Sequence, residues 1–394
     1  MSRFVQFCAF LLIIIATVAH SQTKPRARDL GVPFDGTPGP NNAITDVKGV
    51  EVGHTTLIRG EGKLVVGQGP VRTGVTAILP RGKTSTDAVF GAWFTLNGNG
   101  EMTGTTWLED SGILDGPVMI TNTHSVGVVR DAVIAWKVKR GGPDMEGYWW
   151  SLPVVAETWD GFLNDINGFH VKPDDVFHAL DSAHPGPVEE GSVGGGTGMV
   201  CNEFKGGIGT SSRVLNAKEG AYTVGVLVQC NYGRRPELRI AGVPVGKEIP
   251  EHPAYEDETS SLRPTPGLDT GSIIIVIATD APLIPTQLKR VARRAALGLG
   301  RDGSYSGDGS GDIFVAFSTA NTGVASPKGI HDVKMLPNDS LDPIFLATVR
   351  ATEEAVVNAM VAADTMTGID SHTAIGLPHD KLREVLKKYN RLAK

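Results

Sequence analysis

The chain has 394 residues, of which 41% are hydrophobic and 20% are charged, and this balance is ordinary for a soluble globular protein. The length is enough for a large core and for one or two domains. Because the formal net charge is −6 and the sequence has no basic block or stripe, we expect no nucleic-acid partner.

The first 21 residues have the pattern of a secretory signal peptide. Arg3 precedes an apolar run that includes residues 10–16, and Ala19-His20-Ser21 fits the small-x-small pattern of a cleavage site. The apolar run is shorter than the ~20 residues that a membrane span needs. We therefore expect cleavage before Gln22, a single mature domain over residues 22–394 that is periplasmic or secreted, and no membrane attachment once the signal is removed.

Apolar residues recur with the helical period in some segments and form short runs in others, and glycine or proline separates these segments. In chain order the predicted elements are short strands and loops within 50–112, a strand at 117–122, helices at 128–138 and 173–180, flexible glycine-rich loops at 191–198 and 206–209, a strand at 223–229, a strand at 273–279, a helix at 286–297, a strand at 313–318, and helices at 342–366 and 379–392. Helices and strands are thus mixed without strict β–α alternation, which favours a layered α+β sandwich over a doubly wound sheet.

Several motifs are absent or stand in the wrong context. The G-x-G-x-x-G pattern at 298–303 follows a helix rather than a strand, so we interpret it as a helix end and a turn and not as a dinucleotide site. No cysteine–histidine cluster has zinc spacing, so we expect no zinc site of that kind. Cys201 and Cys230 remain after the signal peptide. They could pair in an oxidising compartment or stay buried and free, and the sequence leaves both possibilities open.

The dipeptide Gly271-Ser272 stands between a proline-rich irregular stretch, residues 232–271, and the apolar strand at 273–279. A long irregular segment inside a compact domain is usually functional or disordered. Glycine before a hydroxyl residue at a strand start is where a self-cleaving hydrolase would cut its own chain. Gly-Ser is also a common turn pair, and the dipeptide taken alone favours the turn.

Two other polar segments lie at the ends of predicted strands. Ser310 and Asp312 lead into the strand at 313–318, and Asn231 follows the strand at 223–229. Each of these residues could be an ordinary turn or strand-end residue. Their occurrence together with Ser272 favours a common catalytic site.

Taken as a whole, the sequence resembles the DmpA-like aminopeptidases, also called β-aminopeptidases or L-aminopeptidase/D-esterases. The resemblance covers nearly the whole mature chain, and its matching segments are residues 28–47, 97–104, 153–158, 191–199, 204–210, 271–272, 278–283 and 309–312. It implies a four-layer αββα sandwich that is similar to the N-terminal nucleophile hydrolases but differently connected. It also implies self-cleavage into an α chain of residues 22–271 and a β chain of residues 272–394, assembly into a homo-oligomer of such heterodimers, and no metal or organic cofactor.

The resemblance gives each polar residue a role. Ser272 would cut the bond after Gly271 and then use its freed α-amine as the base, because an α-amine with a pKa of ~7.7–8.0 is partly neutral near pH 7. Ser310 would relay or orient the proton, and Asp312, where some relatives carry glutamate, would hold that network. Asn231 would donate to the oxyanion.

Substrate binding rests on two further residues. We expect Glu157 to bind the free ammonium group of the substrate, although a core-edge or surface glutamate is an alternative. Trp159 stands where some relatives carry tyrosine, and lining the substrate pocket is one role open to it. The expected function is a serine aminopeptidase that releases N-terminal residues from short peptides, amides and esters through an acyl-enzyme. The sequence leaves the preference among α-, β-amino and D-residues open.

Two alternatives remain at the level of the sequence. An acyltransferase of the ornithine acetyltransferase kind also cuts itself at a small hydroxyl residue, but the signal peptide argues against that cytosolic chemistry. A secreted binding protein with the same fold would need no catalytic residues. The presence of Ser272, Ser310 and Asn231 argues against it.

Overall fold

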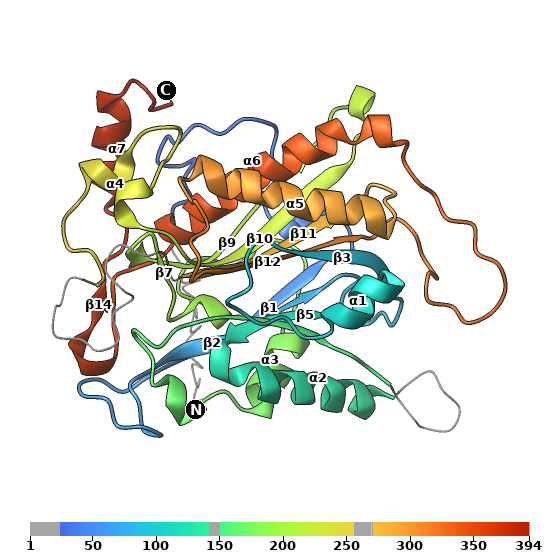
Figure 1. The fold of residues 1–394 in the computed structure, drawn as a ribbon, viewed down its shortest axis with the longest axis horizontal. Helices are drawn as coiled ribbons and strands as arrows, with labels where there is room; N and C mark the ends of the chain where they lie inside the picture. The colour runs from blue at the N-terminus through green and yellow to red at the C-terminus, as the bar shows by residue number, and fades with distance from the viewer. Residues whose placement is uncertain (1–23, 142–149, 256–268, 270, 394) are drawn as a thin grey trace, which may run out of the picture.

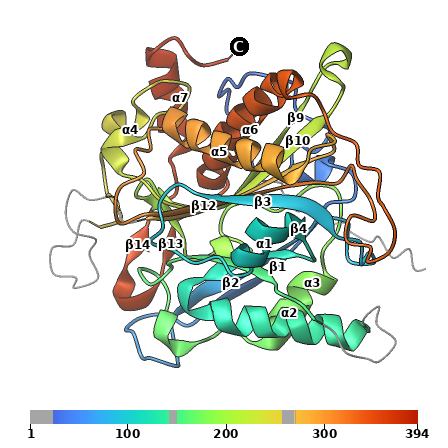
Figure 2. The ribbon, with the colours of Figure 1, turned by 45° about the vertical axis from the view of Figure 1, so that its right-hand side comes forward.

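Two stacked β-sheets form the middle of the molecule, and helices cover the outer face of each (Figures 1 and 2). The structure is a computed structural model that describes residues 24–141, 150–255, 269 and 271–393. The signal-peptide prediction and much of the irregular stretch before Gly271 lie outside these residues. The predicted α+β sandwich of four layers is confirmed by this arrangement.

The first sheet has four strands in the order β1-β2-β5-β6. They are β1 (Glu51–Arg59), β2 (Val71–Leu79), β5 (Val118–Asn122) and β6 (Val154–Thr158). The helices α2 (Val126–Arg140) and α3 (Pro173–Asp181) cover its outer face, at the bottom of Figure 1. Pro173 at the first position and two acidic residues in the first turn explain where α3 begins.

The second sheet has six strands in the order β4-β3-β12-β11-β10-β9. They are β4 (Ile113–Leu114), β3 (Val89–Thr95), β12 (Gly311–Ser318), β11 (Ser272–Thr279), β10 (Thr223–Asn231) and β9 (Gly207–Val214). The helices α5 (Pro285–Arg301) and α6 (Asp342–Val361) cover its outer face, at the top of Figure 1. The short helices α1 (Thr105–Ser111), α4 (Val245–Glu248) and α7 (His379–Lys388) lie at the edges, with the hairpins β7 (Val200–Cys201) to β8 (Phe204–Lys205) and β13 (Met366–Thr367) to β14 (Thr373–Ala374).

Strand β11 is buried on both faces, and this explains its continuous apolar sequence. Ile273, Ile275 and Ile277 pack in the layer under α5 and α6. Ile274 and Val276 pack between the two sheets, because successive side chains of a strand point to opposite faces. Burial of these branched side chains on both sides fixes the register of β11, since a slip by one residue would move each of them to the wrong layer.

Most of the predicted elements are confirmed, and the main errors are four. The expected flexible loop at 206–209 is largely part of β9, and the glycine-rich segment 191–198 is a mostly buried turn between the sheets rather than a flexible loop. Helix α6 ends at Val361, five residues before the predicted end at Met366. Helix α1 lies in a region where only strands and loops were expected.

Cys201 and Cys230 form a disulfide that joins β7 to β10. This observation decides between the two possibilities that the sequence left open. Within the described residues, no helix combines the length and the apolar character that a membrane crossing requires.

Candidate active site

The pairing of three neighbouring strands brings the predicted site residues to one end of the six-stranded sheet. Ser272, the first residue of β11, lies opposite Asn231 of antiparallel β10 and opposite Gly311 of parallel β12. Strand alternation points the side chains of Ser272 and Asn231 toward the four-stranded sheet. Both residues are buried and are ladder partners, so a hydroxyl and an amide lie side by side between the two sheets.

The side-chain amide of Asn231 is held in one orientation by two neighbours. Its Oδ1 accepts a hydrogen bond from the backbone N–H of Val200 at 2.8 Å, and its Nδ2 donates to the carbonyl oxygen of Trp159 at 2.9 Å. In the flipped amide, Nδ2 would face the Val200 N–H, which is also a donor, and Oδ1 would face the Trp159 carbonyl, which is also an acceptor. These contacts therefore exclude the flipped orientation. The second Nδ2–H is left to donate to another acceptor.

Ser310 and Asp312 form a buried pair beside the start of β11. The Ser310 hydroxyl donates to Asp312 Oδ1 at 2.7 Å, and both residues are fully buried. Burial raises the pKa of Asp312 to about 6, and the hydrogen bond from Ser310 opposes this shift. The pair can therefore hold or release a proton near neutral pH.

The backbone at Gly271 fits the site only because glycine has no side chain. A Cβ there would lie 2.3 Å from the carbonyl oxygen of Asn231 and 2.5 Å from the Cα of Tyr232. The carbonyl oxygen of Gly271 accepts a hydrogen bond from the Gly311 N–H at 3.2 Å. The bond between Gly271 and Ser272 is thus closely packed, and its carbonyl is already polarised by a backbone donor.

Glu157, at the end of β6, brings a carboxylate from the other sheet to the same region. A Cβ on Gly100 would lie 3.3 Å from both Glu157 Oε1 and the Cα of Gly311, so the carboxylate is close to the ladder partner of Ser272. Glu157 is only 3% exposed, which excludes a surface role. Its oxygens accept from the Glu101 N–H at 2.9 Å and from the Thr123 hydroxyl, and burial raises its pKa.

Trp159 lies beside Asn231 and contributes more than its carbonyl group. Its partly buried side chain packs with Phe162, Tyr255 and neighbouring residues in a small apolar cluster next to β6. A Cβ on Gly161 would lie 2.6 Å from the indole ring, so the ring covers this glycine closely. The proposed role of Trp159 in lining the substrate pocket stays a prediction.

Sequence reasoning missed three residues that connect the segments of the site. Asp269 accepts from the N–H groups of Gly233 at 3.1 Å and of Gly271 and Gly307 at 3.4 Å each, so one carboxylate joins three segments. Asn97 Oδ1 accepts from the Asp312 N–H at 2.9 Å, and Asn99 Nδ2 donates to the Gly309 carbonyl at 2.7 Å. The only sequence signal for Asn97 and Asn99 was their place in a matching segment, to which no role was given.

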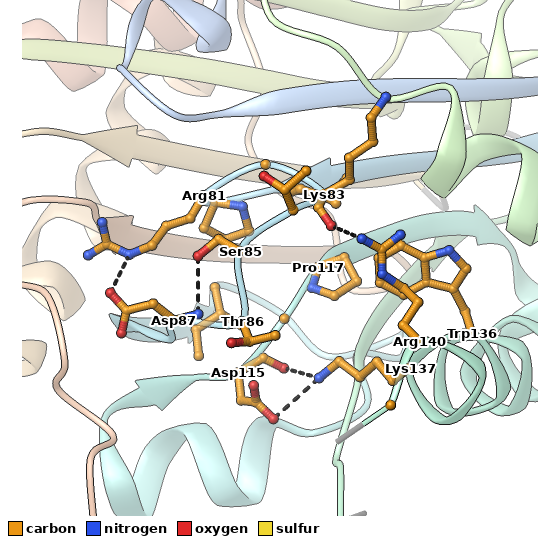
Figure 3. Close-up of a pocket in the computed structure, with 17 residues that line it drawn as sticks. Arg81, Lys83, Ser85, Thr86, Asp87, Asp115, Pro117, Trp136, Lys137 and Arg140 are labelled. Atoms are coloured by element: carbon orange, nitrogen blue, oxygen red, sulfur yellow. Dashed lines mark hydrogen bonds and ion pairs between the residues drawn. The ribbon is translucent and has the colours of Figure 1, made fainter. Parts of the chain in front are cut away.

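A separate pocket lies at the opposite end of the sheets, near the starts of β3 and β5 (Figure 3). Its cationic side chains are already engaged. Arg81 pairs with Asp87 at 3.3 Å, and Lys137 donates to Asp115 and to Ser151 at 3.0 Å. The strand β3 separates this pocket from the Ser272 end by seven residues, or about 20 Å, so it is not part of the site described above.

Comparison with known proteins agrees with this geometry. The sequence model of peptidase family S58 matches residues 42–374. The β-peptidyl aminopeptidase BapA of Sphingosinicella microcystinivorans is 57% identical to this chain, with 99% of each chain covered. A Burkholderia sp. β-aminopeptidase structure superposes with a TM-score of 0.83 at 47% identity, covering 92% of this chain and 99% of that chain.

The structure of an L-aminopeptidase D-Ala-esterase/amidase from Ochrobactrum anthropi, described as a variant of the Ntn hydrolase fold, superposes with a TM-score of 0.85. The two chains are 49% identical, and the alignment covers 94% of this chain and 100% of that one. The fold and the relatives therefore define an Ntn-like aminopeptidase. The chain belongs to peptidase family S58, as the resemblance in its sequence predicted, and this assignment argues against both the acyltransferase and the binding protein.

Proposed function

We propose that this aminopeptidase is made as a precursor that cuts itself between Gly271 and Ser272 and then uses Ser272 as an N-terminal nucleophile. The observation that carries the proposal is the strand register, which sets Ser272 between Asn231 and Gly311 at one end of the sheet. A hydroxyl, an amide donor and a polarised peptide carbonyl meet there. These are the groups that acyl transfer requires.

Self-cleavage begins with attack of Ser272 Oγ on the carbonyl carbon of Gly271. The Gly311 N–H, already 3.2 Å from that carbonyl oxygen, stabilises the negative charge that develops on it. The C–N bond breaks, the Ser272 nitrogen takes up a proton, and an ester joins Gly271 to Ser272 Oγ. Water then hydrolyses the ester, which leaves a carboxylate on Gly271 and a free α-amine on Ser272.

Substrate hydrolysis repeats the attack with the freed amine as base. The α-amine accepts the hydroxyl proton of Ser272 while Oγ attacks the substrate carbonyl, and the free Nδ2–H of Asn231 donates to the oxyanion. The ammonium then gives its proton to the leaving amine, and water releases the acyl group. The Ser310 and Asp312 pair supports the ammonium form.

The substrate is selected by its free N-terminal ammonium group, which pairs with Glu157. We infer that N-terminal β-amino residues are accepted, because relatives of up to 57% identity are β-peptidyl aminopeptidases. A β-residue places its ammonium one methylene further from the scissile carbonyl than an α-residue does. Trp159 and its apolar cluster would form the wall along which this longer unit lies.

We further propose that the enzyme is exported and assembles as a homo-oligomer of αβ heterodimers. The signal-like sequence before Gln22 supports export, and the Cys201–Cys230 disulfide is of a kind that persists in oxidising compartments. Periplasmic and secreted locations are both compatible with these features. Size-exclusion chromatography with light scattering gives the oligomer size directly.

The decisive experiment compares the wild-type protein with Ser272→Ala on denaturing gels. The wild type should give two chains, and N-terminal sequencing of the smaller one should begin at Ser272. The variant should stay intact and should not release p-nitroaniline from β-alanyl-p-nitroanilide. The control Ser326→Ala, at an exposed serine, should be cut as the wild type is. An active, uncut Ser272→Ala protein would refute the nucleophile assignment.

A further inference from the structure

A lysine is completely buried next to the proposed site, and no step of the mechanism above uses it. Lys205 lies on β8 with 0% exposure. Its Nζ donates to three backbone carbonyls, those of Gly206 at 2.7 Å, Met199 at 3.0 Å and Gly196 at 3.4 Å. All three acceptors are neutral, so the ammonium is held inside the protein by dipoles and not by a carboxylate.

One of these carbonyls connects the lysine to the catalytic amide. The peptide between Met199 and Val200 accepts from Lys205 through its oxygen, and it donates through its N–H to Asn231 Oδ1 at 2.8 Å. A continuous chain of hydrogen bonds therefore runs from the ammonium through one peptide group to the side-chain amide of Asn231. The next group along this chain is the second Nδ2–H of Asn231, the one proposed above to donate to the oxyanion.

The direction of polarisation along this chain is the same at every link. A positive charge at the peptide oxygen draws electron density from the peptide nitrogen and makes its N–H a stronger donor. A stronger bond to Oδ1 in turn makes the Nδ2–H groups stronger donors, because hydrogen bonds in a row reinforce one another in a medium of low dielectric constant. Burial of every group in the chain keeps water from screening the effect.

We propose that Lys205 is a positioning residue that strengthens and fixes the Asn231 oxyanion donor through the Met199–Val200 peptide. This inference rests on the oxyanion role proposed for Asn231. A buried cation without a carboxylate partner is costly to the fold, and an apolar residue of the same length would avoid that cost. Burial also lowers the pKa of Lys205 to about 7, and the negative charge of Asp364 opposes this shift.

The test is the variant Lys205→Met, which keeps the length of the side chain and removes the charge. We expect kcat for β-alanyl-p-nitroanilide, per processed active site, to fall roughly tenfold while KM changes little, because the lost effect is a part of the ~10²–10³-fold that one oxyanion donor supplies. Self-cleavage of the precursor is expected to slow as well. The matched control is Lys137→Met at the far end of the sheets, a buried lysine that donates to Asp115 and Ser151, and it should keep the wild-type kcat per folded enzyme.

A double-mutant cycle with Asn231→Ala separates this inference from the function on which it rests. If Lys205 acts through Asn231, then Lys205→Met should lower kcat less than twofold in the Asn231→Ala background. If the fold-decrease in kcat of the double variant equals the product of the two single decreases, the inference is overturned, because the lysine would then act independently of Asn231. Wild-type kcat in Asn231→Ala would overturn the oxyanion assignment, and wild-type kcat in Lys205→Met alone would overturn only the inference.

A second variant keeps the test open if Lys205→Met does not fold. Lys205→Gln keeps neutral N–H donors for the carbonyls of the glycine-rich segment. We expect it to lower kcat by a similar factor and to shift the Val200 amide proton resonance upfield, since the charge that polarises this peptide is gone. A glutamine variant with wild-type kcat and an unchanged Val200 resonance would refute the role of the charge.

Discussion

At the scale of single residues, the Glu157 carboxylate is buried before a substrate arrives, and neutral donors hold it. The ammonium group of a bound substrate would favour the ionised form of the Glu157 carboxylate, which burial disfavours. We expect Glu157→Gln to weaken this pairing by about 2–5 kcal/mol, which lowers kcat/KM roughly 30-fold or more for substrates with a free amine. Esters with a blocked amine should lose far less. Kinetics on a matched pair of free and N-acetylated esters checks this, and equal losses would remove the proposed role.

The raised pKa of Asp312 predicts how the free energy of unfolding depends on pH. Its pKa of about 6 in the fold lies above the ordinary value of ~3.9, so the folded state binds more protons between these values and stability falls as pH rises from about 4 to about 6. Asp312→Asn should remove this loss, which is on the order of 2–3 kcal/mol. Urea unfolding in the uncut Ser272→Ala background at pH 4.5 and pH 7 measures it. The exposed Asp308→Asn is the control, and the same pH slope in Asp312→Asn as in the wild type would contradict the assignment.

At the scale of elements, the wrong prediction of a flexible loop at 206–209 has a tertiary cause. Glycine at 207 and 209 normally favours a turn, but here it serves close packing. A Cβ on Gly209 would lie 2.0 Å from the carbonyl oxygen of Ala355 and 2.6 Å from the amide nitrogen of Ala359 in α6. Gly207 lets the chain pass close to Gly191, whose carbonyl oxygen would lie 2.0 Å from a Cβ there, and Gly209 lets α6 lie directly on β9. That tertiary contact cannot be read from local sequence, which explains why a strand was expected to be a flexible loop.

The helices show the same limit at their ends. The apolar residues of α6 continue past Val361, and the helix stops where the chain turns toward the β13–β14 hairpin, a pairing made with residues 373–374. Helix α1 is short and contains two threonines and a tryptophan, which are weak helix formers. The signal that could have found it is the pair Gly104 and Gly112, which flank it in the left-handed conformation. Long periodic helices such as α2 and α5 were predictable because burial of one face sets their period.

Helix α5 provides a matched pair of glycines within the rejected dinucleotide pattern. A Cβ on Gly298 would lie 2.6 Å from Thr352 Cβ in α6, whereas a Cβ on Gly300 would meet nothing within 4 Å. Gly298→Ala should therefore lower the free energy of unfolding by about 1–3 kcal/mol through overpacking. Gly300→Ala should raise it by up to about 1 kcal/mol, since alanine favours a helix. Urea unfolding of the two variants checks this, and equal effects would contradict close packing of α5 on α6.

At the scale of the whole molecule, the sequence could predict which polar residues flank the apolar strands and that they belong to one site, but not which strands lie side by side. That the backbones of Ser272, Asn231 and Asp312 lie at the same end of the sheet depends on the order of its strands, which single-strand patterns do not reveal. Lys205 and Asp269 were missed because their importance comes from what folds around them. The resemblance to a family supplied the topology that local physical chemistry could not.

The Cys201–Cys230 disulfide is expected to stabilise the whole molecule. Cys201 and Cys230 are 29 residues apart, and a loop of this size is expected to restrict the unfolded chain by about 3–4 kcal/mol. The paired variant Cys201→Ala with Cys230→Ala should lose roughly this much in the uncut Ser272→Ala background. Thermal unfolding with and without reductant measures it. An unchanged midpoint on reduction of the wild-type disulfide would show that the bridge does not stabilise the fold.

The place of β11 in the six-stranded sheet determines what happens after the proposed cut. All eight of its residues pair with β10 on one side and with β12 on the other, so a strand of the new β chain stays locked beside a strand of the α chain. The two chains then share one sheet, although no peptide bond joins them. Once denatured, they would have to find each other in solution without the linkage that first aligned them. An enzyme cut in this way can be built from its precursor, but after denaturation it has no intramolecular route back to its fold.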